Sequence, residues 1–306
     1  MNPLQEALKR YKDETAQFPK PLENQKAQLY SIEPSERQSE SLPYHINYTQ
    51  SRCVEVSREL LQQHRLLNED SSPLFLESYK RLKTQVLHRF HEHHWTVLGI
   101  FSPRSQVGAT LTAVNLAIAL GMDMTLTVLL AEGNLQEPSL QRLFGFPPGS
   151  GLAEYLQVGT PLADCLVHPN LGRLVVLPGG EPVSSSLEFL TSPVMVDLVQ
   201  EMKSRYVGRL IIFDLPPLLE SSDTLAFCPF LDASLLVVEE GKTTKFDVEE
   251  SLQLLQGSVP VLGTVCNKVG RQTLSLKSAR HVARSGQPSD SMASPPLWKR
   301  IFQRGD

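Results

Sequence analysis

The sequence contains few of the features that mark secreted, membrane-spanning or zinc-binding proteins. Its 306 residues include only four cysteines, and none of them forms a Cys-x-x-Cys pair. Widely spaced cysteines of this kind are typical of reduced thiols in a cytosolic protein. No run of about 18 apolar residues is present, and the N-terminus lacks the basic and then apolar profile of a secretion signal. We therefore expect a cytoplasmic protein without a membrane-spanning segment.

The sequence also lacks a strong excess of charge of either sign. The formal net charge is −4, which gives no general attraction to nucleic acid, so no nucleic-acid partner is expected. Residues 271–306 are the exception, with seven Lys and Arg against two Asp. A solvated tail explains this stretch. The alternative is attraction to anionic lipid, with Trp298, Ile301 and Phe302 at the interface. The basic tail, or a partner, would then place the protein at the inner membrane.

The hydrophobic pattern divides the chain into four segments. Residues 1–50 are rich in Gln, Glu, Pro and Ser and are predicted to be flexible. Residues 51–90 are predicted to be linker and interaction helices, because apolar residues over 74–90 recur at spacings of three and four. Residues 91–270 are predicted to form the main domain, and residues 271–306 a flexible basic tail.

Within residues 91–270, apolar stretches of strand length alternate with helical stretches. Continuous apolar strands separated by helices predict an α/β fold, in which a parallel sheet is covered by helices on both faces. The predicted strands span residues 97–101, 126–131, 174–177, 210–213, 234–238 and 261–265. The predicted helices between them span residues 111–122, 139–144, 152–157, 193–206 and 246–255.

A candidate phosphate-binding loop lies between the first apolar strand and the helix that follows it. Residues 102–110 read Ser-Pro-Arg-Ser-Gln-Val-Gly-Ala-Thr. A strand–loop–helix is the setting in which such loops hold phosphate on backbone N–H groups and a helix N-terminus. Loops of this type normally end in Gly-Lys-Ser/Thr. Gly108 and Thr110 are present, but Ala109 fills the lysine position. The alternative is an ordinary strand-to-helix turn.

Two acidic residues follow other predicted strands, at the edge where open α/β sheets bind ligands. Asp214 ends an apolar strand and precedes Pro216 and Pro217, which make the following loop rigid. Together with Thr110, Asp214 is a candidate ligand for Mg²⁺, directly or through water. Glu132 ends another strand. For Asp214, a helix-capping role is the alternative.

These motifs, taken along the chain, resemble those of the bacterial tyrosine kinases (BY-kinases) of polysaccharide export, a branch of the ParA/MinD-like deviant P-loop ATPases. Within that family, the sequence is most similar to the exosortase-associated tyrosine autokinase group. The resemblance covers residues 58–269 and implies the P-loop fold of the family. It rests on Ser102-Pro103 with Ser105, Asn115-Leu116-Ala117, Pro138-Ser139-Leu140, Leu177-Pro178-Gly179-Gly180, Ile212-Phe213-Asp214 with residues 216–219, residues 237–244 and residues 262–268.

The resemblance implies ATP and Mg²⁺ as the ligands of the site. By this resemblance, Asp214 and Glu132 stand at the catalytic positions of the family, and Thr110 and Asp214 stand at its metal-binding position. The residues carried onto nucleotide-binding positions are Ser105, Gly108, Ala109, Thr110, Leu111 and Asn267, the last of them near the adenine.

The resemblance also implies a contact between subunits. In the family, the helix before the first core strand joins neighbouring subunits, and Glu77, Lys80 and Lys83 fall at the matching positions. Self-association is therefore expected. A solvated helix face with a local Glu77–Lys80 pair would show the same spacing.

The chain departs from the family at the positions that carry its chemistry. Ala109 replaces the loop lysine, and Gln106 and Val107 replace the Gly and Glu before it. Glu132 and Asn134 replace the two aspartates of the second acidic motif. Losing a cation beside the transferring phosphoryl group costs on the order of 10²-fold or more in rate. These changes predict a silent or crippled site, at which ATP binding is in question.

The usual phosphoacceptors are missing as well. Active relatives often carry a tyrosine cluster at the C-terminus, whereas no tyrosine follows Tyr206 here. The tyrosines of the N-terminal segment could be substrates of another kinase, or ordinary surface aromatics. They are Tyr11, Tyr30, Tyr44 and Tyr48.

Three functions are compatible with this sequence. The favoured one is a kinase-like regulator of exopolysaccharide or capsule biosynthesis and export, which binds a membrane chain-length (co-polymerase) protein or an active kinase paralogue. The second is an active ATP-dependent tyrosine autokinase, in which Arg104, Lys242 or Lys245 substitutes for the missing lysine. The third is a ParA/MinD-type positioning ATPase.

Overall fold

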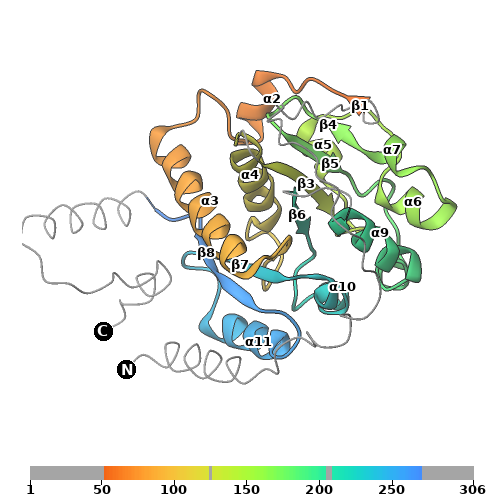
Figure 1. Ribbon diagram of the computed structural model, residues 1–306. Coiled ribbons are helices and arrows are strands. Elements are labelled where there is room, and N and C mark those ends of the chain that lie inside the picture. Colours follow the sequence, from red (N-terminus) through yellow and green to blue (C-terminus); the bar gives the residue numbers. More distant parts are fainter. Residues whose placement is uncertain (1–51, 124–125, 205–208, 271–306) are drawn as a thin grey trace, which may run out of the picture.

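The computed structural model describes residues 52–123, 126–204 and 209–270 (Figure 1). The two segments that the sequence predicts to be flexible, 1–50 and 271–306, lie outside these residues, as does the predicted end of one helix at Tyr206. Among the described residues, no helix combines the length and the hydropathy that crossing a bilayer requires.

An eight-stranded sheet forms the centre of the described chain, with its strands in the order β1–β4–β5–β3–β6–β2–β7–β8. The strands are β1 (Arg52–Cys53), β2 (Val97–Phe101), β3 (Thr127–Glu132), β4 (Val167–His168), β5 (Leu174–Leu177), β6 (Arg209–Asp214), β7 (Ala233–Glu239) and β8 (Val261–Asn267). All residues of β2, β3 and β5 are buried, which explains their continuous apolar composition.

The predicted α/β sheet is confirmed, with one correction: the sheet is mixed rather than entirely parallel. Strands β4 and β5 are antiparallel, whereas the other neighbouring strands are parallel. The chain leaves β4 at His168 and enters β5 at Leu174. So short a connection can only reverse the chain, because a parallel pair needs a crossover of about a dozen residues or more. Asn170 and Gly172 make the reversal with φ angles of 57° and 60°.

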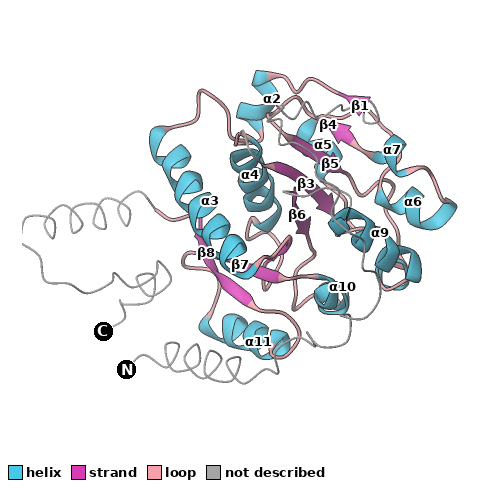
Figure 2. Ribbon diagram, viewed as in Figure 1, coloured by secondary structure: helices cyan, strands magenta, loops and turns pink. Residues whose placement is uncertain are grey.

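Helices cover both faces of the sheet (Figure 2). They are α2 (Arg58–Gln63), α3 (Pro73–His93), α4 (Ala109–Gly121), α5 (Leu140–Phe144), α6 (Leu152–Val158), α7 (Leu162–Cys165), α8 (Ser186–Leu190), α9 (Pro193–Ser204), α10 (Ser222–Phe227) and α11 (Lys245–Leu255), with a 3₁₀ helix, η1 (Cys228–Phe230).

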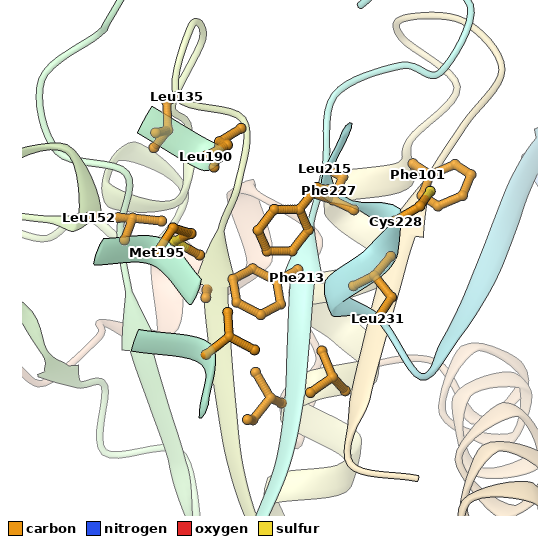
Figure 3. Close-up of a cluster of buried hydrophobic side chains, with 14 of the residues drawn as sticks. Phe101, Leu135, Leu152, Leu190, Met195, Phe213, Leu215, Phe227, Cys228 and Leu231 are labelled. Carbon is orange, nitrogen blue, oxygen red and sulfur yellow. The ribbon is translucent and has the colours of Figure 1, made fainter. Parts of the chain in front are cut away.

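Two buried apolar clusters, one on each face of the sheet, hold these layers together. Along β6, Leu210 and Ile212 belong to one cluster, and Ile211 and Phe213 to the other, as the alternation of side chains along a strand requires. Helices α3, α4 and α5 complete the first cluster, and α6, α9, α10 and α11 complete the second. Figure 3 shows the second cluster. In it the rings of Phe213 and Phe227 are tilted against each other, with their centroids 4.7 Å apart.

The segment before β2 is fastened to α4 by Asn115. This fully buried side chain accepts a hydrogen bond from the Leu67 amide (2.7 Å) and donates one to the Arg65 carbonyl (3.1 Å). Helix α3 contributes Val86 and Phe90 to the same apolar cluster as α4. Residues 52–93 and the sheet therefore share one hydrophobic core.

Candidate functional site

The loop between β2 and α4 has the backbone conformation of a tight, glycine-dependent turn. Gly108 is the N-cap of α4 with a φ of 96°, and a Cβ at this position would collide with the side-chain amide of Asn267. Gln106 also adopts a left-handed φ, of 62°. This is the position where the resembling family has glycine. The strain costs roughly 1 kcal/mol for a residue with a Cβ.

The loop is braced by the segment that follows β6. The amides of Leu218 and Leu219 donate hydrogen bonds to the carbonyls of Ser102 (2.9 Å) and Pro103 (3.0 Å). The Thr224 hydroxyl of α10 in turn donates to the Pro216 carbonyl (2.7 Å). The Pro-Pro segment and the candidate phosphate loop therefore form one rigid unit at the carboxyl edge of the sheet.

The end of β8 holds the other side of the loop. Asn267 donates from Nδ2 to the Val107 carbonyl (2.9 Å), and Lys268 donates from Nζ to the Gln106 carbonyl (2.7 Å) and to Glu239 (2.9 Å). The structure therefore brings Asn267 to the loop, as the sequence motifs indicate, but it is the loop backbone that this side chain contacts. Lys268 belongs to the motif of residues 262–268, but the sequence did not predict its contacts with the loop and with Glu239, because they join residues far apart along the chain.

The positive charges near the loop are bound to carboxylates. Ala109 itself is 8% exposed and packs among apolar side chains. The proposed substitute cations are all engaged: Arg104 with Asp247 (2.7 Å), Lys242 with Glu239 (3.7 Å) and Lys245 with Glu249 (3.4 Å). The hydrogen bond and the charge of Asp247 raise the pKa of Arg104 above its ordinary value.

Asp214 and Glu132 end two neighbouring strands and are register partners across β6 and β3. Asp214 is 1% exposed, and neither of its carboxylate oxygens has a hydrogen-bond partner among the described residues. Burial raises the pKa of Asp214 well above its ordinary value, the charge of Glu132 raises it further, and the nearby Thr110 hydroxyl lowers it. The structure thus brings Asp214 and Thr110 together.

The Glu132 carboxylate is hydrogen bonded to backbone amides. It accepts hydrogen bonds from the amides of Ser139, Leu140 (2.9 Å) and Gly179 (2.8 Å). Burial raises its pKa, and these backbone donors oppose the shift. Glu132 therefore fixes the start of α5 and the turn after β5. Its neighbour Asn134 accepts a hydrogen bond from the Glu137 amide (3.2 Å) and so closes a local turn.

The implied ligands fit this arrangement only in part. A buried carboxyl group without a partner, next to the Thr110 hydroxyl, offers the hard oxygen ligands that Mg²⁺ prefers. The part of the site that would hold phosphate fits that ligand poorly, because Ala109 has no charge and because Arg104 and Lys268 are bound to carboxylates. The backbone amides of Ser105 to Leu111 are what a phosphate would contact.

The three candidate interface residues lie on α3. Glu77 pairs with Arg81 (2.9 Å), not with Lys80, and Lys83 pairs with Asp123 at the end of α4 (3.1 Å). Lys80 is exposed. The local pair that the sequence suggested is therefore not formed, and the contact between subunits stays a prediction.

The curated proteins similar to this chain include bacterial tyrosine-protein kinases. No family model matches the chain. The Bacillus subtilis tyrosine-protein kinase YwqD is 26% identical over 208 residues, which cover 68% of this chain and 86% of YwqD. The Acinetobacter johnsonii tyrosine-protein kinase ptk is 23% identical over 67% of this chain, but this match spans only 28% of that longer protein.

A solved structure points the same way. The kinase domain of the Escherichia coli tyrosine kinase ETK aligns with a TM-score of 0.60 and 25% identity, over 72% of this chain and 89% of that domain. The homologues of this chain are therefore bacterial tyrosine-protein kinases, and its fold is the fold of their kinase domains.

Proposed function

We propose that this chain is a kinase-like P-loop protein of exopolysaccharide or capsule assembly, that its phosphoryl-transfer site is degenerate, and that it acts as a regulator by binding another protein. The observation that carries the proposal is Ala109 in a loop whose neighbouring cations are bound to carboxylates. An uncharged side chain cannot offset the charge that develops on a transferred phosphoryl group. Such a loss costs on the order of 10²-fold or more in rate.

The second acidic motif supports the same conclusion. A general base must reach the proton that it removes. Glu132 instead accepts three backbone hydrogen bonds at the start of α5 and at Gly179, and Asn134 has no basic group to offer. Asp214 and Thr110 retain the residue types of a magnesium site, so weak metal binding is compatible with the proposal.

The partner class comes from the resemblance and from the homologues. We propose a membrane co-polymerase (chain-length) protein or an active kinase paralogue, bound at the cytoplasmic side of the inner membrane. Helix α3, with Glu77, Lys80 and Lys83, is the candidate contact surface for a paralogue or for a second copy of the chain.

Nucleotide titration of the purified full chain tests the proposal. Isothermal titration calorimetry with ATP, with and without Mg²⁺, measures binding, and ADP release measures turnover. We expect no tight Mg²⁺-dependent binding and no turnover above the buffer control. Tight binding with turnover would refute the degenerate site and leave the fold assignment intact.

An active tyrosine autokinase is the second candidate, and the retained Asp214 and Thr110 favour it. In that case another cation already serves the loop, so Ala109→Lys would change the rate of autophosphorylation little. Under our proposal the wild-type chain has no autophosphorylation to change, and Ala109→Lys alone does not create it, because Glu132 and Asn134 are altered too.

A further inference from the structure

Glu220 stands beside the candidate phosphate loop, and its position is set by the backbone. The amides on either side of it are fixed: Leu219 donates to the Pro103 carbonyl (3.0 Å), and Ser221 donates to the Pro217 carbonyl (3.0 Å). From this position, the Glu220 carboxylate accepts a hydrogen bond from the Ser105 amide (3.1 Å). The negative side chain of Glu220 is therefore hydrogen bonded to one of the backbone N–H groups of the loop.

The same carboxylate acts on the only cationic side chain within residues 102–110, Arg104. Arg104 is hydrogen bonded to Asp247 at 2.7 Å and lies in the field of Glu220 and Glu250 as well. Three carboxylates thus act on one guanidinium group. Because Arg104 is half exposed, these charges weaken its attraction for a phosphate without cancelling it.

We propose that Glu220 is an internal competitor for phosphate at this loop. Its carboxylate takes the Ser105 amide and places a negative charge beside the loop, so the loop would repel a polyphosphate even if the lysine at position 109 were restored. This inference rests on the proposed degenerate site. It adds a second obstacle to phosphate binding, which is independent of Ala109. The anion that is excluded is the polyphosphate group of a nucleotide.

The test compares three variants in which the loop lysine is restored: Ala109→Lys alone, Ala109→Lys with Glu220→Gln, and Ala109→Lys with Glu92→Gln. Gln at position 220 keeps a hydrogen-bond acceptor for Ser105 and removes only the charge. Glu92→Gln is the matched control, because it removes the same charge from an exposed residue that pairs with Arg89 before β2, at the edge of the sheet opposite the loop. Calorimetry at low ionic strength measures affinity for inorganic tripolyphosphate and for Mg-ATP.

We expect Glu220→Gln to raise the affinity for tripolyphosphate roughly tenfold over Ala109→Lys alone, as one charge near a multiply charged anion at the surface would. Added salt should reduce this difference in affinity, because the side chains of Glu220 and Arg104 are exposed to solvent. Glu92→Gln should leave the affinity within about twofold of Ala109→Lys alone. Equal affinities with and without the Glu220 charge overturn the inference, while a wild-type chain that binds ATP tightly overturns the proposed function instead.

Because Lys at the buried position 109 can prevent folding, circular dichroism and a thermal melt accompany each variant. If Ala109→Lys does not fold, the wild-type chain and the single variant Glu220→Gln are compared with millimolar tripolyphosphate. The variant should bind more tightly. Identical binding of these two proteins overturns the inference in the same way.

Discussion

Among the described residues, Asp214 has a pKa that burial raises well above its ordinary value. Neither of its carboxylate oxygens has a hydrogen-bond partner in this part of the chain. An acid of this kind binds its proton more tightly in the folded chain than in the unfolded one. Its contribution to stability is therefore complete below the pKa of the unfolded chain, about 4, and is lost as the pH rises through the folded pKa.

Asp214→Asn removes that dependence. We expect the free energy of unfolding of the variant to exceed that of the wild-type chain by an amount that grows as the pH rises above the unfolded pKa of about 4. Urea unfolding at several pH values measures the difference, and Glu132 titrates in both proteins. Parallel pH profiles would contradict a perturbed Asp214.

Gln106 pays a conformational penalty of its own, with a φ of 62°. Gln106→Gly relieves the left-handed strain, and the added freedom of glycine in the unfolded chain offsets part of the gain. We expect stabilisation of about 0.5 kcal/mol. Gln85→Gly, at an exposed position inside α3, is the control and should destabilise by about 1 kcal/mol. Thermal unfolding distinguishes them, and destabilisation by both variants would argue against strain at Gln106.

Among the helices, α11 has a capping arrangement that also holds the candidate loop. Thr244 and Asp247 form a capping box, and the Asp247 carboxylate accepts from Thr244 Oγ1 (2.6 Å) and from Arg104 (2.7 Å). The Thr244 hydroxyl is the largest of the effects that lower the pKa of Asp247. An acidic group whose pKa is lowered by folding stabilises the fold above its unfolded pKa of about 4. That contribution is lost as the pH falls through the folded pKa.

Asp247→Ala removes the ion pair and the half of the capping box in which its carboxylate accepts from Thr244, whereas Arg104→Ala removes only an ion pair that is half exposed. We expect losses of about 2 kcal/mol for Asp247→Ala and less than about 1 kcal/mol for Arg104→Ala. Guanidinium unfolding of the two single variants and the double variant gives the coupling energy. Equal losses for the two single variants would show that the cap contributes little.

For the molecule as a whole, Asn115 is one of the contacts that hold residues 52–68, the N-terminal arm, against the sheet. Asn115→Ala leaves the buried Leu67 amide without its acceptor, so we expect a loss of about 2–3 kcal/mol. Asn134→Ala is the matched control, because it removes one exposed hydrogen bond, and it should cost about 0.5 kcal/mol.

Hydrogen exchange locates the effect of Asn115→Ala. Amides of residues 52–68 should exchange faster in this variant than in the Asn134→Ala control, beyond the change expected from global stability. Uniform acceleration across the sheet would mean that the arm unfolds only with the rest of the chain.

Much of the architecture follows from the local pattern. Six of the strands and the long helices α3, α4, α9 and α11 coincide with the predicted stretches, within a few residues at their ends. Strands β1 and β4 and helices α7, α8 and α10 are absent from the prediction. Each spans two to six residues, which is too short for hydrophobic periodicity to show.

The order of residues along this chain was enough to fix the class of fold, the position of the loop, and the loss of its lysine, because each depends on a short stretch and its immediate neighbours. The partners of the charged groups were decided only in three dimensions. Lys268 reaches the Gln106 carbonyl across 162 positions, and Glu132 turns toward Gly179, 47 positions away. Which carboxylates Arg104 and Lys268 meet depends on the strand order β6–β2–β7–β8, and that order follows from packing of the whole sheet.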